Sequence, residues 1–286
     1  MRFLRVGEAG HERPVVMDGS VFYDLRPLTD DLHPSFWASG GVARCRRALS
    51  AGALSPTSIE GERIGAAVPK PPSIICVGMN YAAHAAESGA SAPEHVVVFF
   101  KKPNTVVGPN DPIVLPPGSR HTDWEVELAV VLGRELRHAP DDATALDAVA
   151  GYALANDLSE REHQLKVSGG QWSKGKSAAG FAPIGPWIAT PDEVGDIQSL
   201  TMRSWVNGEP RQDSTTADMV FPVAAILRDL SRYMVLEAGD VVLTGTPEGV
   251  ALSRRYPYLA PGDRVTMEID GLGRIEQSVV EEADAA

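Results

Sequence analysis

In the stretch HTDWEVELAV (residues 121–130), two glutamates stand one residue apart at the start of an apolar segment. Side chains alternate along a strand, so Glu125 and Glu127 would share one face, with Cβ atoms roughly 6.6 Å apart at about 3.3 Å per residue. Two carboxylates this close repel each other, and a divalent cation between them turns the repulsion into a binding site. A strand with one solvated face explains the same pair without any function, so more of the chain is needed to choose.

A third carboxylate, Asp157, ends the segment GYALAND (151–157), where it follows small alanines. Taken alone, Asp157 is more often a turn residue before a helix than a metal ligand. Together with Glu125 and Glu127 it would supply three hard oxygen donors, with no cysteine or compact histidine partner nearby. That donor set favours Mg²⁺ or Mn²⁺, ranks Ca²⁺ second and suits Zn²⁺ poorly.

A histidine and a glutamate occur three residues apart in NYAAHAAES (80–88). If this segment is helical, His84 and Glu87 are neighbours on one face. A carboxylate beside an imidazole orients the ring and raises its basicity, which is how a general base for a water molecule is assembled. The spacing alone favours a plainer interpretation, an exposed pair on a solvated turn.

Two lysines stand in a glycine-rich, apolar setting, QWSKGKSAAGFAPIGPW (171–187). A lysine in such a place can neutralise a developing enolate or hold a carboxylate. Surface lysines are the more common case, so Lys174 and Lys176 are candidates only.

Three more polar residues can face the same pocket. Arg161 and Gln164 follow Asp157 at i, i+3 spacing and would be neighbours on a helix. In LTGTPEGV (243–250), a strand runs into a Gly-Thr-Pro loop whose backbone N–H groups and Thr246 hydroxyl can bind a carboxylate. The glycine spacing and the ending of this loop do not match a phosphate-binding loop.

The elements that would carry these residues are mostly strands. Before residue 68, Asp18–Gly19 lies between two apolar-rich runs and predicts a hairpin. Three prolines in VPKPP (68–72) then mark a stiff connector. Beyond it, β-branched and aromatic residues bounded by turn dipeptides predict strands in SIICVGM, HVVVFFK, residues 124–132, GYALAND, SLTMRSWVNG, DVVLTG and RVTMEID.

Helices are fewer. The apolar pattern predicts helices at 142–149 and 222–233, and a third opens at SERE (159–162), where Ser159 and Glu162 have the spacing of a capping box. Many strands with irregular helical insertions, and no regular alternation of strand and helix, favour an α+β fold.

Bulk properties exclude several classes of protein. A chain of 286 residues with 43% apolar and 22% charged residues is ordinary for a globular protein. The formal charge of −12 argues against a nucleic-acid partner. Two isolated cysteines fit a reducing compartment, the N-terminal stretch lacks the apolar core of a signal peptide, and no apolar run approaches the roughly 20 residues that span a membrane. We expect a cytoplasmic protein without a membrane partner.

Six motifs, in this order, give the chain a resemblance to a known family: ICVGMNYAAHAAE, DWEVELAVVLG, NDLSEREHQ, GKSAAGFAPIGPW, VNGEPRQDSTTADMVF and LEAGDVVLTGTPEGV. Over about residues 70–280 the chain resembles the fumarylacetoacetate hydrolase family, within its bacterial branch of diketo acid hydrolases and oxo acid decarboxylases. The resemblance implies a mixed β-roll catalytic domain (69–286), a small N-terminal β-rich domain (1–68) and a homodimer.

Carried over position by position, the resemblance implies a role for each candidate residue. It makes Glu125, Glu127 and Asp157 the Mg²⁺ ligands, His84 and Glu87 the water-activating pair on a segment that commonly closes over ligand, Lys176 the substrate contact beside the metal, and Arg161, Gln164 and Thr246 the lining of the pocket. One departure is that Ala178–Ala179 stand where relatives usually have an aspartate, which bears on the support of the pocket and on the substrate, but not on the metal.

The expected reaction is the Mg²⁺-dependent hydrolysis of the C–C bond in a 2,4-dioxo acid, such as an acylpyruvate, a fumarylacetoacetate-like acid or a diketo acid derived from a deoxy sugar. Decarboxylation of an acid such as oxaloacetate and isomerisation of an unsaturated oxo acid are alternatives on the same site. A non-catalytic module that binds Ca²⁺ for stability is the rival from another class. It has no need of His84, Glu87 and Lys176 together.

Overall fold

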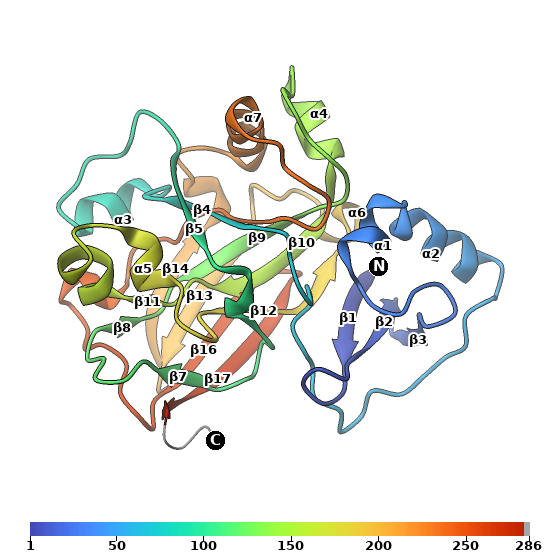
Figure 1. The fold of residues 1–286 in the computed structure, drawn as a ribbon, viewed down its shortest axis with the longest axis horizontal. Helices are drawn as coiled ribbons and strands as arrows, with labels where there is room; N and C mark the ends of the chain where they lie inside the picture. Colours follow the sequence, from blue (N-terminus) through green and yellow to red (C-terminus); the bar gives the residue numbers. More distant parts are fainter. Residues whose placement is uncertain (283–286) are drawn as a thin grey trace.

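The computed structural model describes residues 1–282 and contains one large mixed sheet, one smaller sheet and few helices (Figure 1). The large sheet has ten strands in the order β3-β2-β1-β12-β10-β9-β15-β4-β5, with β6 paired to β12. Their bounds are β1 Arg2–Val6, β2 Arg13–Asp18, β3 Val21–Asp24, β4 Ile74–Gly78, β5 Val97–Lys101, β6 Val106–Val107, β9 Val126–Leu132, β10 Val149–Asn156, β12 Ala182–Ala189 and β15 Val241–Leu243. The α+β fold predicted from the sequence is confirmed.

A five-stranded sheet packs against the large one in the order β14-β13-β16-β17-β7, and β8 and β11 form a separate pair. The bounds of these strands are β7 Ile113–Leu115, β8 Thr122–Asp123, β11 Ser159–Glu160, β13 Thr201–Val206, β14 Glu209–Thr215, β16 Arg264–Ile269 and β17 Gly273–Glu281. All seven strands predicted beyond residue 72 are present, as β4, β5, β9, β10, β13, β15 and β16.

Residues 1–282 also contain seven α-helices and four short helices of 3₁₀ or π type. The α-helices are α1 Pro34–Ala38, α2 Gly41–Ser50, α3 Ala82–Glu87, α4 Asp142–Asp147, α5 Trp172–Lys176, α6 Pro191–Val194 and α7 Val223–Tyr233. The short ones are η1 Pro103–Thr105, η2 His163–Val167, η3 Thr216–Asp218 and η4 Ala251–Ser253. Within this part of the chain, no helix has the length and apolar character to cross a bilayer.

The helices predicted at 142–149 and 222–233 are confirmed as α4 and α7. The helix predicted to open at Ser159 is wrong. Ser159 and Glu160 form strand β11, which pairs with β8, and the Ser159 hydroxyl donates to the Asp157 carbonyl oxygen instead of capping a helix. Helical backbone begins only at Arg161 and continues into the π-helical turn η2.

The N-terminal segment is continuous with the rest of the large sheet. Its predicted hairpin is confirmed, because β2 and β3 pair across Asp18–Gly19. Strand β1 pairs antiparallel with β12, which places β1–β3, α1 and α2 at one end of the molecule (Figure 1). The division into units 1–68 and 69–286 stays a prediction, because β1–β3 belong to the same sheet as β4–β15.

Strand β9 is buried on both faces, so Glu125 and Glu127 do not lie on a solvated surface. Val126, Leu128 and Val130 lie in a core cluster with residues of the five-stranded sheet, whereas Ala129 and Val131 lie in a second cluster. Because side chains alternate along a strand, Glu125 and Glu127 lie on the same face as Ala129 and Val131. The interpretation of a strand with one solvated face is therefore wrong.

Candidate active site

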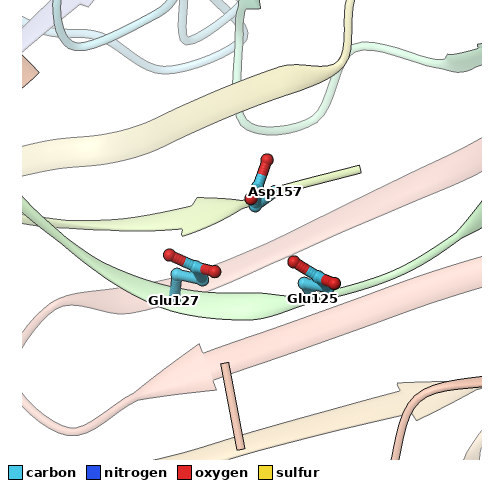
Figure 2. Close-up of side chains that lie close together, drawn as sticks. All are labelled: Glu125, Glu127 and Asp157. Carbon is cyan, nitrogen blue, oxygen red and sulfur yellow. The ribbon is translucent and has the colours of Figure 1, made fainter. Parts of the chain in front are cut away.

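The pairing of β9 with β10 brings the three predicted carboxylates together. Ala155 pairs with Glu127, Asn156 with Val126, and the Asp157 N–H donates to the Glu125 carbonyl oxygen at 2.9 Å. Each of the acidic side chains Glu125, Glu127 and Asp157 offers an oxygen within 4.8 Å of the others, and all three residues are buried (Figure 2). Residues separated by some 30 positions thus form one cluster through strand register.

Two cations hold two of these carboxylates. The Lys176 ammonium lies 2.5 Å from Glu125 Oε2 and 2.6 Å from Asp157 Oδ2. The Arg161 guanidinium lies 2.7 Å from Glu125 Oε1. Burial alone would raise the pKa of Glu125, but the positive charges of Lys176 and Arg161 hold it well below its usual value. Burial would likewise lower the pKa of Lys176, but Asp157 and Glu125 raise it, so Lys176 stays charged.

Glu127 has no such partner. Its Oε2 accepts a hydrogen bond from the Gly245 N–H at 2.8 Å, and none of the ion pairs within residues 1–282 involves it. Burial and the negative charges of Asp157 and Glu125 raise the pKa of Glu127 well above its usual value. A divalent cation bound by three hard oxygen donors would relieve this excess of negative charge, so the cluster fits Mg²⁺, Mn²⁺ or Ca²⁺ in charge and in ligand chemistry.

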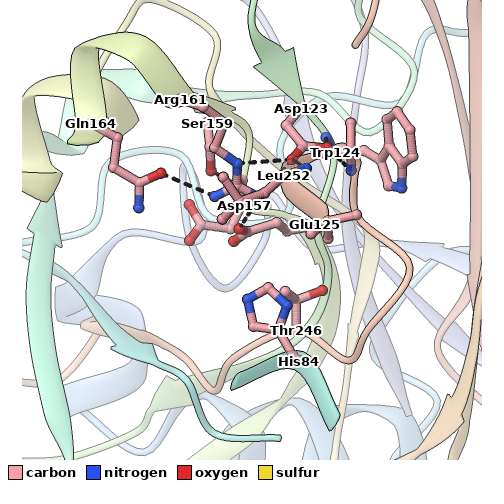
Figure 3. A network of polar contacts seen from close by, with 12 residues as sticks. His84, Asp123, Trp124, Glu125, Asp157, Ser159, Arg161, Gln164, Thr246 and Leu252 are labelled. Carbon is pink, nitrogen blue, oxygen red and sulfur yellow. Dashed lines mark hydrogen bonds and ion pairs between the residues drawn. The ribbon is translucent and has the colours of Figure 1, made fainter. Parts of the chain in front are cut away.

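Two further buried charges support the cluster and were not identified from the sequence. Lys101 donates to Asp157 Oδ1 at 2.5 Å and to the Leu158 carbonyl oxygen at 2.9 Å. Asp123 accepts from Arg161 Nε at 2.8 Å (Figure 3). Burial lowers the pKa of Lys101, and the Asp157 charge partly offsets this effect. The signal for Lys101 was available, since alternation in the predicted strand places it on the same face as buried Phe99.

The predicted histidine–glutamate pair is formed on helix α3. His84 Nδ1 lies 2.9 Å from Glu87 Oε1, and because a carboxylate only accepts, the Nδ1 proton is the one donated. Glu87 also accepts from the Gly249 N–H, at 3.2 Å to Oε1 and 3.1 Å to Oε2. Glu87 therefore ties α3 to the loop that follows β15 and leaves His84 Nε2 as the free ring nitrogen.

The carboxylates and the histidine open onto one cavity of about 620 Å³. Its lining contains eight of the nine residues selected from the sequence, namely His84, Glu87, Glu125, Glu127, Arg161, Gln164, Lys176 and Thr246. Asp157 lies behind Lys176 rather than in the lining, held by Lys176 and Lys101. The volume suits a small organic acid.

The family model for the fumarylacetoacetate (FAA) hydrolase C-terminal domain matches residues 73–280, which is most of the chain. A relative from Burkholderia multivorans, whose name suggests a hydrolase, is 45% identical over 280 residues, covering 96% of each chain. The chain belongs to the fumarylacetoacetate hydrolase family. The resemblance inferred from the six motifs is confirmed.

Solved structures with the same fold include several named enzymes of this kind. Fumarylacetoacetate hydrolase from Exiguobacterium antarcticum is 34% identical with a TM-score of 0.84, covering 99% of this chain and 100% of that one. Maleylpyruvate hydrolase from Sphingobium sp. SYK-6, in complex with manganese(II) and pyruvate, is 30% identical with a TM-score of 0.79, covering 98% and 99%. A 5-carboxymethyl-2-hydroxymuconate delta-isomerase from Mycobacterium smegmatis is 32% identical with a TM-score of 0.77, covering 99% of both chains.

In this member of the fumarylacetoacetate hydrolase family, the remaining residues selected from the sequence differ in whether they keep a hydrogen-bond donor for a ligand. Gln164 Oε1 accepts from Arg161 Nη1 at 3.0 Å, so its amide nitrogen is available. The Thr246 hydroxyl donates to the Val126 carbonyl oxygen and accepts from Gln212, which leaves no hydroxyl proton for a ligand. Lys174 is exposed, whereas Lys176 is buried. The substrate-binding roles of Arg161, Gln164 and Thr246 stay predictions.

Proposed function

We propose that this protein is a Mg²⁺-dependent hydrolase that cleaves the C–C bond of a 2,4-dioxo acid and releases pyruvate. The observation that carries the proposal is that a charged buried lysine, a histidine–glutamate pair and two carboxylates of the buried three-carboxylate cluster line one cavity, with the third carboxylate, Asp157, directly behind the lysine. A module that only binds a metal for stability has no need of the lysine or of the histidine–glutamate pair.

Glu125, Glu127 and Asp157 would hold the metal, with Mg²⁺ as the proposed ion, Mn²⁺ as a substitute and Ca²⁺ less favoured. When bound, the ion supplies Lewis-acid polarisation of the substrate's 2-oxo and carboxylate oxygens. The manganese and pyruvate found together in the Sphingobium enzyme support this assignment for a relative of the same fold.

His84 is proposed to activate water. Its Nδ1–H is fixed by Glu87, so Nε2 can take a proton from a water molecule as that water attacks the C4 carbonyl. The attack forms a C–O bond at C4. The C3–C4 bond then breaks, its electron pair stays on C3 as the enolate of pyruvate, and the fragment that carries C4 leaves as a carboxylic acid.

Lys176 is proposed to stabilise the enolate oxygen. Its ammonium is buried and kept charged by Glu125 and Asp157, so it is a preorganised donor that needs no proton uptake during the reaction. The proton taken by His84 can return to C3 and complete the formation of pyruvate.

A second candidate is the isomerisation of an unsaturated oxo acid, which the M. smegmatis delta-isomerase of the same fold favours. There, His84 would move a proton between two carbons without adding water. Decarboxylation of oxaloacetate passes through the same enolate and is the third reaction to test. We further propose that the enzyme is a cytoplasmic homodimer with a small oxo acid as its ligand and with neither nucleic acid nor membrane as a partner.

A substrate panel tests this function. Purified enzyme with Mg²⁺ is mixed separately with acylpyruvates, diketo acids derived from deoxy sugars, an unsaturated 2-oxo acid and oxaloacetate, and each is followed by ultraviolet absorbance and by assay of pyruvate. The proposal predicts stoichiometric pyruvate from a 2,4-dioxo acid. Isomerisation of the unsaturated acid with no pyruvate from any 2,4-dioxo acid would contradict it and favour the second candidate.

A further inference from the structure

The loop that follows β15 leaves the large sheet beside Glu127. Strand β15 pairs with β9 over residues 241–243 only. Further along the loop, the Gly245 N–H donates to Glu127 Oε2 at 2.8 Å. The Thr246 hydroxyl then donates to the Val126 carbonyl oxygen at 2.9 Å. Regular pairing between the two strands therefore ends before it reaches Glu127, and side-chain hydrogen bonds hold the loop to β9 beyond that point.

Gln212 completes this link from the five-stranded sheet. It is the one buried residue of β14, at 1% exposure. Its amide oxygen accepts from the Val126 N–H at 3.1 Å and from the Ser204 hydroxyl at 3.0 Å. Its amide nitrogen donates to Thr246 Oγ1 at 2.7 Å and to the Pro247 carbonyl oxygen at 2.8 Å. A backbone N–H only donates and a carbonyl oxygen only accepts, so the amide has a single orientation.

The hydrogen bonds of Gln212 and Thr246 enclose the backbone of Val126, the residue between the two glutamates. The Val126 N–H donates to Gln212, the Val126 carbonyl oxygen accepts from Thr246, and the two side chains are bonded to each other. Loss of either side chain would leave a buried backbone group without a partner, which is costly. The placement of Glu125 and Glu127 against the loop therefore depends on this closed ring of hydrogen bonds.

The far end of the loop also lies against β14. Gly249 has φ of 102°, and a Cβ at this position would lie 2.1 Å from the Arg211 carbonyl oxygen. The Gly249 N–H donates to both oxygens of Glu87, the partner of His84. Arg211 directly precedes Gln212, so one short stretch of β14 supports the start of the loop beside the carboxylates and its end beside the histidine–glutamate pair.

We propose that Gln212 is a positioning residue of the candidate active site, which holds β9 and the loop 244–250 together so that Glu127 and Glu87 keep their places. This inference deepens the proposed function and rests on it for the role of the metal. Gln212 is outside the cavity lining, so it acts through Val126 and Thr246 rather than on the substrate.

Calorimetric titration of the metal-free protein with Mg²⁺ is the first test. Gln212→Met keeps the length of the side chain and removes all four hydrogen bonds, so it should weaken Mg²⁺ binding by about tenfold, as for loss of a group that orients a metal ligand. The matched control Ser204→Ala removes one bond to the same amide and should keep the wild-type affinity. An unchanged affinity in Gln212→Met, or equal weakening in both variants, would overturn the proposal.

A double-mutant cycle tests whether Gln212 acts through the loop. Gln212→Met, Thr246→Val and the double variant are titrated with Mg²⁺ in the same way. If the two side chains act through their shared hydrogen bond, the double variant should bind Mg²⁺ about as well as the weaker single variant, because contacting residues are not additive. Losses that multiply would show that the two residues act independently and would contradict the proposal.

Amide hydrogen exchange of the metal-free protein separates this inference from the proposed function. In Gln212→Met, the N–H groups of Gly245 and Gly249 should exchange about tenfold faster, while those of β15 keep their wild-type rates. This result would support the role of Gln212 even if the wild-type protein bound no Mg²⁺, an outcome that counts against the proposed function alone. Unchanged exchange at both glycines would overturn the inference whatever the metal affinity.

Discussion

Two lysines of α5, only two residues apart in sequence, lie in opposite environments. Lys176 is buried between Glu125 and Asp157, whereas Lys174 is exposed. If the Lys176 ammonium stabilises the enolate, Lys176→Met should lower kcat by roughly 10²–10³-fold, as for the loss of one preorganised donor. Hydrolysis and decarboxylation should fall alike.

The matched control is Lys174→Met, which should leave kcat within about twofold, because an exposed substitution away from the site is usually neutral. Circular dichroism should be unchanged in both variants. Equal losses of kcat, or a larger loss in Lys174→Met, would mean that the wrong lysine has been assigned to the enolate.

Substitutions of His84 and Glu87 test whether the enzyme activates water, because hydrolysis requires an activated water molecule and decarboxylation requires only a stabilised enolate. His84→Ala should reduce kcat/KM for a 2,4-dioxo acid by about 10²–10⁴-fold, the usual worth of a general base. Decarboxylation of oxaloacetate, where present, should fall far less, and Glu87→Gln should act in the same direction but more mildly. A parallel collapse of both reactions in His84→Ala would exclude the role of water-activating base.

At the residue scale, spacing identified the candidate pairs, but on spacing alone a solvated pair was the plainer interpretation, and the resemblance to the family selected the functional one. The spacing of Glu125 and Glu127 and that of His84 and Glu87 follow from strand and helix periodicity, and the structure brings each pair together. Alternation in the predicted strand HVVVFFK indicates that Lys101 shares a face with buried Phe99, but its ion pair with Asp157 depends on long-range packing that local sequence does not show.

At the element scale, the seating of α5 against the π-helical turn η2 depends on Gly175. A Cβ on Gly175 would lie 2.4 Å from the Gln164 backbone nitrogen, closer than real contacts allow. Gly175→Ala should therefore lower the free energy of unfolding by about 1–3 kcal/mol, as is typical of overpacking. It should also lower kcat/KM, because Lys176 is the next residue.

Urea unfolding and steady-state kinetics check this prediction, with Lys174→Ala as the control on the exposed side of the same helix. The control should stay within about 0.5 kcal/mol of wild type. A Gly175→Ala variant as stable and as active as that control would show that the contact between α5 and η2 does not position Lys176.

Helices and strands with a strong apolar periodicity or clear turn residues were predictable from the sequence. Elements that exist only through pairing with a distant strand were not. The hairpin at Asp18–Gly19 and helix α7 carry local signals that survive in the structure. The helix expected at Ser159 failed because pairing of β11 with β8 takes up the backbone that the capping box would have used. A two-residue strand has too little pattern to be found from sequence alone.

At the scale of the whole molecule, the N-terminal segment covers an edge that would otherwise be open. Strand β1 pairs with β12, and Phe3, Phe36 and Trp37 share a core cluster with Ile184 and Ile188. Residues 69–286 alone would therefore expose the β12 edge and part of that core. We predict a melting temperature lower by at least about 10 °C, or aggregation.

Differential scanning calorimetry of the full-length protein and of the fragment 69–286 tests this prediction. A fragment 69–286 that melts at the wild-type temperature and stays dispersed would show that residues 1–68 form an independent domain, as the connector at 68–72 predicts. The sequence alone indicates the connector, but the shared sheet is a consequence of long-range pairing that local patterns do not encode.

The most direct test of the account is the dependence of C–C cleavage on a metal held by Glu125, Glu127 and Asp157. Enzyme treated with a chelator and then dialysed should be inactive towards a 2,4-dioxo acid and should recover with Mg²⁺, and Glu127→Gln should weaken Mg²⁺ binding by more than roughly tenfold. Calorimetric titration of Mg²⁺ and ultraviolet loss of substrate give both results on one preparation. Full turnover in excess chelator, with no metal found by elemental analysis, would contradict the account.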